Sequence, residues 1–303
     1  MSKQSWTEVR VEAPEGWHEL VGAALSLGPC TTVVVGATSI ATEPPREGFE
    51  FVRTFFPTRE DTPALRSELE AALARLAETT GAEELRDLRV TWRPLPAEDY
   101  ATSWRRVQRP FRLGRIALVP SWESPSLRED DLLLSIEPGK SFGSGRHATT
   151  RTCMRVLQER SIQGARVLDA GTGSGILSVT AAMLGAASTL GFDIDPVSEE
   201  AGAELAERNG VGERCRFRTG DFGVLDPEDE GFDVVLANIY SDVIQAHAKD
   251  LRARLRPGGW YAFSGCPVHH REATRAAIEA AGLELEEERI RGRWSTFVGT
   301  RPS

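Results

Sequence analysis

The stretch that decides the fold reads Val167-Leu-Asp-Ala-Gly171-Thr-Gly173-Ser-Gly175-Ile-Leu, and the next apolar run ends in Gly191-Phe-Asp193-Ile-Asp-Pro. Three glycines alternate after the first apolar run, and an acid closes the second run 22 residues after Gly171. This order predicts one strand–helix–strand unit of a parallel sheet. Glycines let the backbone approach a ligand, and the acid can accept hydrogen bonds from ribose hydroxyls.

The glycine spacing separates two classes of nucleoside ligand. A dinucleotide fingerprint reads G-x-G-x-x-G, which lets a helix N-terminus hold a pyrophosphate. Here the spacing is G-x-G-x-G, which favours S-adenosyl-L-methionine (AdoMet), with its ribose and amino-acid tail, over NAD. We therefore expect Gly171, Gly173 and Asp193 to bind AdoMet. The alternative is that the glycines only allow the strand to pack tightly on its helix.

Composition indicates a globular protein with two domains. The 303 residues are 40% apolar and 27% charged, which is ordinary for a globular chain of this length. No apolar run approaches the ~20 residues of a membrane span, and the first residues lack the apolar core of a signal peptide. We expect a cytoplasmic protein that does not bind membranes. Its cysteines fit no paired framework and are expected to be reduced and buried.

The net charge of −9 constrains the partner. Direct binding to duplex nucleic acid is not expected, because such binding needs a basic surface. A negative surface suits a basic protein partner, since opposite charges speed encounter. The alternative is that the charge only keeps the protein soluble.

Residues 1–93 are predicted to form a small domain with the element order β-α-β-β-α-β. That order is typical of a ferredoxin-like α+β sandwich, and no catalytic constellation lies within it. We expect this domain to dock the substrate, with a purely structural role as the alternative. The predicted strands are 6–11, 31–35, 49–56 and 88–92, and the predicted helices are 15–27 and 63–79.

Residues 94–137 are predicted to connect the two domains. The segment is rich in Trp and Pro. Trp104 and Trp122 could form a binding surface, but large aromatic residues at a junction more commonly pack as core.

From 138 to 303, strands alternate with helices, as in a parallel sheet covered on both faces. The last two strands flank Gly292 with no helix between them, which predicts an antiparallel hairpin at the sheet edge. This α/β layout is that of the seven-stranded, Rossmann-like class I methyltransferases. The predicted strands are 166–170, 188–193, 214–218, 232–237, 260–264, 283–290 and 294–300, and the helices between them include 176–184, 196–209, 241–255 and 269–281.

The loop from Pro138 to Thr150 is rich in glycine and hydroxyl residues and contains one aromatic, Phe142. Such a loop can fold over a bound ligand, so we expect it to cover the methionine tail of AdoMet, with Phe142 as a cofactor contact. The alternative is an ordinary connector. His147 in this loop could act as a base, although a histidine at a helix entrance more commonly caps the helix.

Asn238 ends the fourth strand of the predicted sheet. Ligands of open α/β sheets bind beyond the carboxyl ends of the strands at the switch point, where the strand order reverses. An amide there can accept a hydrogen bond from an amine while it donates to the cofactor, so Asn238 is the candidate catalytic residue and a cofactor contact. The alternative is a turn residue that caps the next helix.

Two further groups of polar residues have ambiguous roles. Asp221 follows the third strand and could bind the adenine amino group, or it could cap a turn. Cys266-Pro-Val-His269-His270 suggests a metal site, but no second pair of ligands has zinc-like spacing, and the cluster is interpreted as a helix start.

Together these motifs resemble the PrmA family, methyltransferases that modify the large-subunit ribosomal protein of the stalk base. The resemblance covers about residues 98–301. It rests on Asp99-Tyr-Ala-Thr-Ser-Trp104, Val119-Pro-Ser-Trp122, the loop 138–150, Leu168-Asp-Ala-Gly171 through Gly175, Asp193-Ile-Asp-Pro, Glu207-Arg-Asn209-Gly210 and Ala237-Asn238-Ile.

The resemblance implies an AdoMet-dependent methyltransferase that modifies amino groups, of lysine or the N-terminus, in a ribosomal protein. Carried over by position, Thr150, Gly171, Asp193 and Asn238 look like the AdoMet contacts of the family. The sequence departs from the family at Arg146, which adds a cation beside the expected acceptor entrance. The alternatives are a methyltransferase for another protein or a small molecule, or a non-catalytic AdoMet-binding factor associated with ribosomes.

Overall fold

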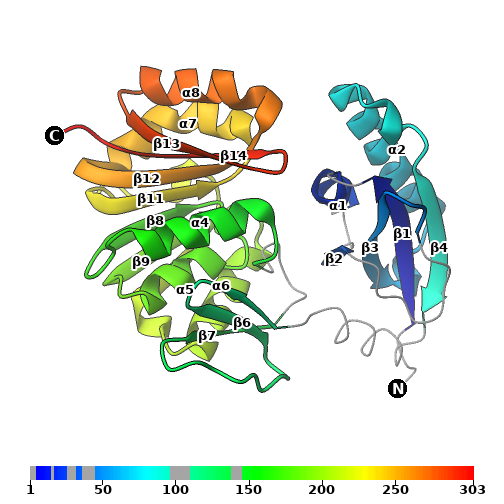
Figure 1. The fold of residues 1–303 in the computed structure, drawn as a ribbon, viewed down its shortest axis with the longest axis horizontal. Helices are drawn as coiled ribbons and strands as arrows, with labels where there is room; N and C mark the ends of the chain where they lie inside the picture. The colour runs from blue at the N-terminus through cyan, green and yellow to red at the C-terminus, as the bar shows by residue number, and fades with distance from the viewer. Residues whose placement is uncertain (1–4, 15–16, 26–31, 36–44, 96–109, 138–144) are drawn as a thin grey trace. The chain divides into compact units, whose positions relative to one another are not determined.

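The computed structural model of the protein describes residues 5–14, 17–25, 32–35, 45–95, 110–137 and 145–303. The chain divides into two compact units, the first containing the described residues up to 95 and the second those from 110 onward (Figure 1). Among the described residues, no helix is long and apolar enough to cross a membrane.

The first unit is a four-stranded antiparallel sheet with two helices. The strand order β2-β3-β1-β4 and the element order confirm the predicted ferredoxin-like fold. The elements are β1 (Trp6–Pro14), α1 (His18–Leu25), β2 (Thr32–Val35), β3 (Phe49–Pro57), η1 (Thr58–Glu60), α2 (Pro63–Thr80), η2 (Glu83–Leu85) and β4 (Arg89–Leu95).

Helix α2 shows how local sequence sets the elements of this unit. The Thr62 hydroxyl accepts a hydrogen bond from the Leu65 amide and so caps the helix start, and Pro63 occupies the first turn. Gly81 ends the helix in the left-handed conformation, with φ of 65°. The buried residues recur every four positions and face the sheet; they are Leu65, Leu69, Leu73 and Ala77.

The second unit contains a seven-stranded sheet with the order β10-β9-β8-β11-β12-β14-β13. Only the pairings that involve β14 are antiparallel, which confirms the class I methyltransferase layout and the final hairpin at the edge. The strands are β8 (Arg166–Ala170), β9 (Ser188–Asp193), β10 (Cys215–Thr219), β11 (Phe232–Asn238), β12 (Leu255–Pro267), β13 (Glu284–Arg291) and β14 (Trp294–Thr300).

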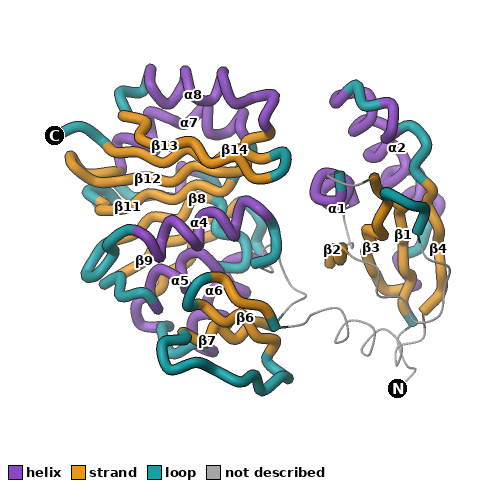
Figure 2. The backbone as a smooth tube through the Cα atoms, viewed as in Figure 1, coloured by secondary structure: helices purple, strands orange, loops and turns teal. Residues whose placement is uncertain are grey.

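Helices cover both faces of this sheet (Figure 2). Neighbouring residues of β8 alternate between the two cores, since Val167 packs with the first group of helices and Leu168 with the second. The first group is α4 (Ala148–Glu159), α5 (Ile176–Met183) and α6 (Val197–Arg208), and the second is α7 (Ser241–Arg254) and α8 (Arg271–Ala280). Short 3₁₀ turns are η3 (Gly212–Arg214), η4 (Phe222–Val224) and η5 (Val268–His270).

Residues 110–137, expected as part of a connector, form a three-stranded sheet in the second unit. Its strands are β5 (Phe111–Leu113), β6 (Ile116–Pro120) and β7 (Leu132–Ile136). Their buried side chains join the core beneath α4, α5 and α6, so this segment is part of the fold and extends the second unit beyond the predicted boundary at 138. Trp122 is half-buried, and Trp104 lies outside the described residues.

Asn209 joins the small sheet to the large domain. Its side chain accepts a hydrogen bond from the Ser135 amide at 2.8 Å and donates to the Ser135 carbonyl at 2.9 Å, as a neighbouring strand would. It also donates to the carbonyl of Leu205 at 2.8 Å and so closes the end of α6. One amide therefore satisfies both backbone groups of a β7 residue and a helix terminus.

We expect Asn209→Ala to lower the free energy of unfolding by about 2–3 kcal/mol, because it leaves partly buried backbone groups of Ser135 unpaired. The measurement is urea unfolding at neutral pH. The control is Arg208→Ala, which removes the neighbouring exposed ion pair with Glu137 and should cost less than about 1 kcal/mol. Equal losses for the two variants would contradict the role of Asn209.

Candidate active site

The predicted ligand residues gather at the carboxyl ends of three neighbouring strands. Strand β8 lies between β9 and β11, and the chain continues from β8 toward β9 on one side and from β11 toward β12 on the other. The strand order therefore reverses between β8 and β11, which is where open α/β sheets bind ligands. Gly171 follows β8, Asp193 ends β9, and Asn238 ends β11.

The three glycines after β8 all have positive φ angles, 72°, 52° and 77°, which only glycine adopts freely. At two of them close packing also leaves no room for a side chain. A Cβ on Gly171 would lie 2.1 Å from Cγ2 of Ile239, and one on Gly175 would lie 2.7 Å from Cα of Gly202. At Gly173, the amide donates a hydrogen bond of 2.8 Å to Oδ2 of Asp193. The turn is therefore shaped by packing and by the acid together.

Asp193 joins the glycine turn to the end of β9. Its Oδ2 accepts from Gly173, and its Oδ1 accepts from the amide of Asp195 at 3.0 Å. The residue is half-buried. Each carboxylate oxygen has a further lone pair, so the side chain is held in place and can still accept hydrogen bonds from two ribose hydroxyls.

Asp169, which was not singled out from the sequence, lies fully buried under the glycine turn. Its Oδ2 accepts from the Thr172 hydroxyl at 2.8 Å and from the hydroxyl and amide of Ser178 at 2.8 and 3.2 Å. Its Oδ1 has no hydrogen-bond partner among the described residues. Burial raises the pKa of this carboxyl to about 6. The signal in the sequence is an acid inside an otherwise apolar strand, because burying a carboxylate costs free energy unless the group is hydrogen-bonded or paired with a positive charge.

These groups suit AdoMet. The ligand carries positive charge on its sulfonium and amino groups, which a buried carboxylate beneath the turn attracts. The ribose matches the fixed acceptors of Asp193. Gly171, Gly173, Asp169 and Asp193 are therefore the residues that would hold it.

Thr150 and Asn238 are 88 residues apart in the sequence and meet at the site. The Asn238 side-chain amide donates to Oγ1 of Thr150 at 3.3 Å. Thr150 is buried in the first turn of α4, while Asn238 is half-buried. The amide nitrogen therefore points to α4, which sets the orientation of the carbonyl oxygen, the atom that can accept from an amine.

Of the two remaining predicted cofactor contacts, only Asp221 lies within the described residues. Asp221 caps η4, because its Oδ1 accepts from the Gly223 amide at 2.8 Å, which is the capping alternative. Its predicted contact with adenine stays a prediction. Phe142 lies outside the described residues, together with the rest of 138–144.

The structure places His147 at the N-cap of α4, where its Nδ1 accepts from the Thr149 amide at 3.4 Å. This confirms the capping interpretation. The imidazole also lies against Trp294, with ring centroids 5.2 Å apart. The Arg146 guanidinium lies over the ring of Phe111, 4.8 Å from its centroid.

The segment Cys266–His270 leads into α8, as the helix-start interpretation requires. Within the described ranges, no three His, Cys, Asp or Glu side chains are grouped to hold a metal ion. Cys153, Cys215 and Cys266 are buried free thiols, and Cys30 lies outside the described residues.

A match to one protein-family model identifies the family of this chain. The model for ribosomal protein L11 methyltransferase (PrmA) matches residues 5–302, nearly the whole chain. The chain belongs to the PrmA family. It is therefore an AdoMet-dependent methyltransferase, as the glycine spacing and the fold predicted.

Relatives of the PrmA family match along most of their length. The ribosomal protein L11 methyltransferase of Pelotomaculum thermopropionicum is 35% identical over 95% of this chain and 96% of its own. That of Chloroflexus aurantiacus is 33% identical over the whole of both chains. Among solved structures, the ribosomal protein L11 methylase of Lactobacillus delbrueckii subsp. bulgaricus is 28% identical with a TM-score of 0.60, covering 65% of this chain and 100% of its own.

The raised pKa of Asp169 has a measurable consequence for this PrmA-family chain. A carboxyl with a higher pKa in the folded than in the unfolded state destabilises the fold at neutral pH, and this cost fades as the pH falls through about 6. We expect Asp169→Asn to be more stable than the wild type at pH 7.5, with an advantage that shrinks by roughly 1–2 kcal/mol at pH 5. Urea unfolding without AdoMet at several pH values measures this difference.

Asp233→Asn is the matched control. Desolvation raises the pKa of Asp233, but the hydrogen bonds from the Arg166 amide and the Arg256 side chain, together with the charges of both arginines, hold it below its ordinary value. That carboxyl therefore stays ionised from pH 7.5 to 5. Its difference from the wild type should not change over this range. A constant difference for Asp169→Asn as well would show that its pKa is not raised.

Proposed function

We propose that this chain transfers methyl groups from AdoMet to amino groups, of lysine side chains or the N-terminus, in ribosomal protein L11 of the large-subunit stalk base. The observation that carries the proposal is the position of Asn238, at the switch point and joined to Thr150 at 3.3 Å. We propose L11 as the substrate because the relatives of Pelotomaculum thermopropionicum and Chloroflexus aurantiacus are both ribosomal protein L11 methyltransferases. Because the proposed substrate is a ribosomal protein, we propose the cytoplasm as the location of the reaction.

Bound AdoMet supplies a methyl group attached to a sulfonium sulfur. When an amine nitrogen attacks the methyl carbon, the carbon–sulfur bond breaks and the rest of the cofactor leaves as a neutral thioether. Because a lysine amine has a pKa of ~10.4, it must lose a proton before it can attack. In this proposal the Asn238 carbonyl oxygen accepts a hydrogen bond from the neutral amine and directs its lone pair at the methyl carbon. The residues of the site contribute mainly by positioning.

The cofactor residues have separate tasks in this scheme. Asp193 holds the ribose, and the turn at Gly171 and Gly173 lets the methionine tail approach the backbone. Thr150 fixes Asn238 from α4, and Asp221 and Phe142 are proposed contacts to adenine and to the tail. The negative charge of Asp169 under the turn favours the cationic ligand.

The first unit is proposed to dock the substrate. Its ferredoxin-like fold has a paired sheet and its own core. The net charge of −9 suits a basic protein such as one that binds RNA in the ribosome. No direct binding to duplex nucleic acid and no membrane partner are proposed.

The proposed function is tested by incubating the chain with radiolabelled AdoMet and undermethylated large-subunit proteins. We expect label on L11, and mass spectrometry of that band then identifies the modified amines. Label on another protein alone would mean that this other protein, and not L11, is the substrate, while the reaction would still be methyl transfer. Binding of AdoMet without any label would favour a non-catalytic role.

We expect Asn238→Ala to lower kcat on L11 by about 100-fold, because the amine loses the acceptor that orients it. The Kd for AdoMet, measured by calorimetry, should rise by less than about tenfold, the worth of one neutral hydrogen bond. Turnover equal to that of the wild type would exclude Asn238 as the catalytic residue.

We expect Asp193→Ala to weaken AdoMet binding by roughly 100-fold, because two charge-assisted hydrogen bonds to the ribose are lost. The matched control is Asp195→Ala. This neighbouring exposed acid accepts from the Val197 amide at the start of α6, and its loss should change the Kd by less than about threefold. Calorimetry on both variants decides whether Asp193 is the ribose ligand.

A further inference from the structure

Two side-chain hydrogen bonds join the N-terminal ends of α7 and α8, one at the start of each helix and one a turn farther along. The Ser241 hydroxyl lies 2.8 Å from Nδ1 of His270, and the Gln245 side-chain amide donates to Oγ1 of Thr274 at 2.9 Å. Each bond spans the same 29 positions in the sequence, and the two lie one helical turn apart. They form a two-rung ladder between the helices.

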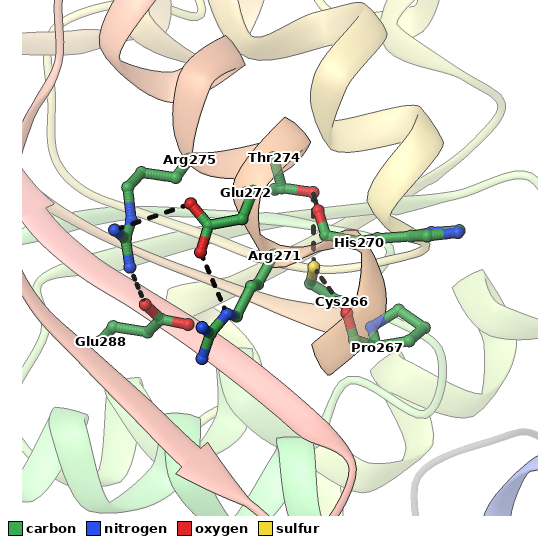
Figure 3. A network of polar contacts seen from close by, with 8 residues as sticks. All are labelled: Cys266, Pro267, His270, Arg271, Glu272, Thr274, Arg275 and Glu288. Atoms are coloured by element: carbon green, nitrogen blue, oxygen red, sulfur yellow. Dashed lines mark hydrogen bonds and ion pairs between the residues drawn. The ribbon is translucent and has the colours of Figure 1, made fainter.

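The start of α8, which carries one side of the ladder, is fixed by contacts with the sheet. The Thr274 hydroxyl lies 3.3 Å from the sulfur of Cys266 and donates to the carbonyl of His270 at 3.0 Å, and Figure 3 shows it between these two groups. Cys266 belongs to β12 and is fully buried. On the outer side of α8, Arg275 pairs with Glu288 of β13. The beginning of α8 is thus tied to two strands of the sheet.

The first rung acts on the turn that carries Asn238. Ser241 is buried and is the first residue of α7, three positions after Asn238. On the strand side, the turn is held at Ile239, whose amide donates to the Ser264 carbonyl at 3.1 Å. A Cβ on Gly265 would lie 2.1 Å from the carbonyl oxygen of Ile239, so backbone packs on backbone there. At the other end of the turn, where α7 begins, His270 holds Ser241 through the hydrogen bond between their side chains.

We propose that His270 is a positioning residue for methyl transfer, which acts through Ser241 to hold the Asn238–Tyr240 turn in the geometry that receives the acceptor amine. This inference rests on the proposed function. Tyr240, which is 61% exposed, lies between Asn238 and Ser241 in the same turn. The second rung lies a turn farther along α7 and has no such link to Asn238.

The test compares His270→Ala with Gln245→Ala, which removes the second rung of the same ladder. We expect His270→Ala to lower kcat on L11 by about tenfold, with a Kd for AdoMet within about twofold of the wild type. Gln245→Ala should leave kcat within about twofold. His270→Asn should recover most of the lost turnover, because its amide reaches the position of Nδ1. Ser241→Ala combined with His270→Ala should be no slower than either single variant.

Hydrogen exchange of the ligand-free chain gives a readout that does not need methyl transfer. The amides of Ile239, Val243 and Ile244 are hydrogen-bonded within or beside this turn, and they should exchange faster in His270→Ala and not in Gln245→Ala. Equal effects of the two variants on kcat and exchange, or no recovery in His270→Asn, would overturn the proposal. If the wild type does not methylate L11, the proposed substrate fails, while the exchange comparison still decides whether His270 holds the turn.

Discussion

The hydrogen bond from the Gly173 amide to Asp193 is the interaction on which the site depends. It joins the turn after β8 to the end of β9, two elements that are neighbours in the sheet. The turn needs glycine because its backbone is left-handed, and the acid needs the turn because a fixed donor orients its carboxylate. The buried Asp169 lies beneath this turn, where its Oδ2 accepts from Thr172 and Ser178. The proposed chemistry at Asn238 requires that arrangement.

Much of the fold could be predicted from the sequence because its elements are regular and well bounded. The strands 166–170, 188–193 and 294–300 have the bounds predicted for them, since apolar runs between glycines and helices leave little freedom. The edge hairpin follows from two strands that flank a single glycine. The meeting of Thr150 and Asn238 could be expected only from the resemblance to a known family, because no spacing rule links residues 88 positions apart.

The features that could not be predicted depend on tertiary packing. The strands β5 to β7 are only three to five residues long, and β6 ends in a proline, so their apolar residues resemble those of a connector unless the core that buries them is known. Asp221 has the same local sequence whether it caps a turn or binds adenine. The Ser241–His270 bond depends on how two helices pack on one face of the sheet. Asp169 is different, because an acid inside an apolar strand is a signal that the sequence itself contains.

The order of strands in the large sheet has a consequence for biosynthesis. Strand β14 comes last in the chain but lies between β12 and β13, and its residues are almost all buried. During translation β13 emerges first and has no neighbour to pair with in the sheet until β14 arrives. The cooperative core on that side therefore closes only after residue 300 has been made, and the nascent chain holds an unpaired strand until then. Charged residues occupy six of the eight positions of β13, Glu284 to Arg291, and they disfavour pairing of this unpaired edge with other chains.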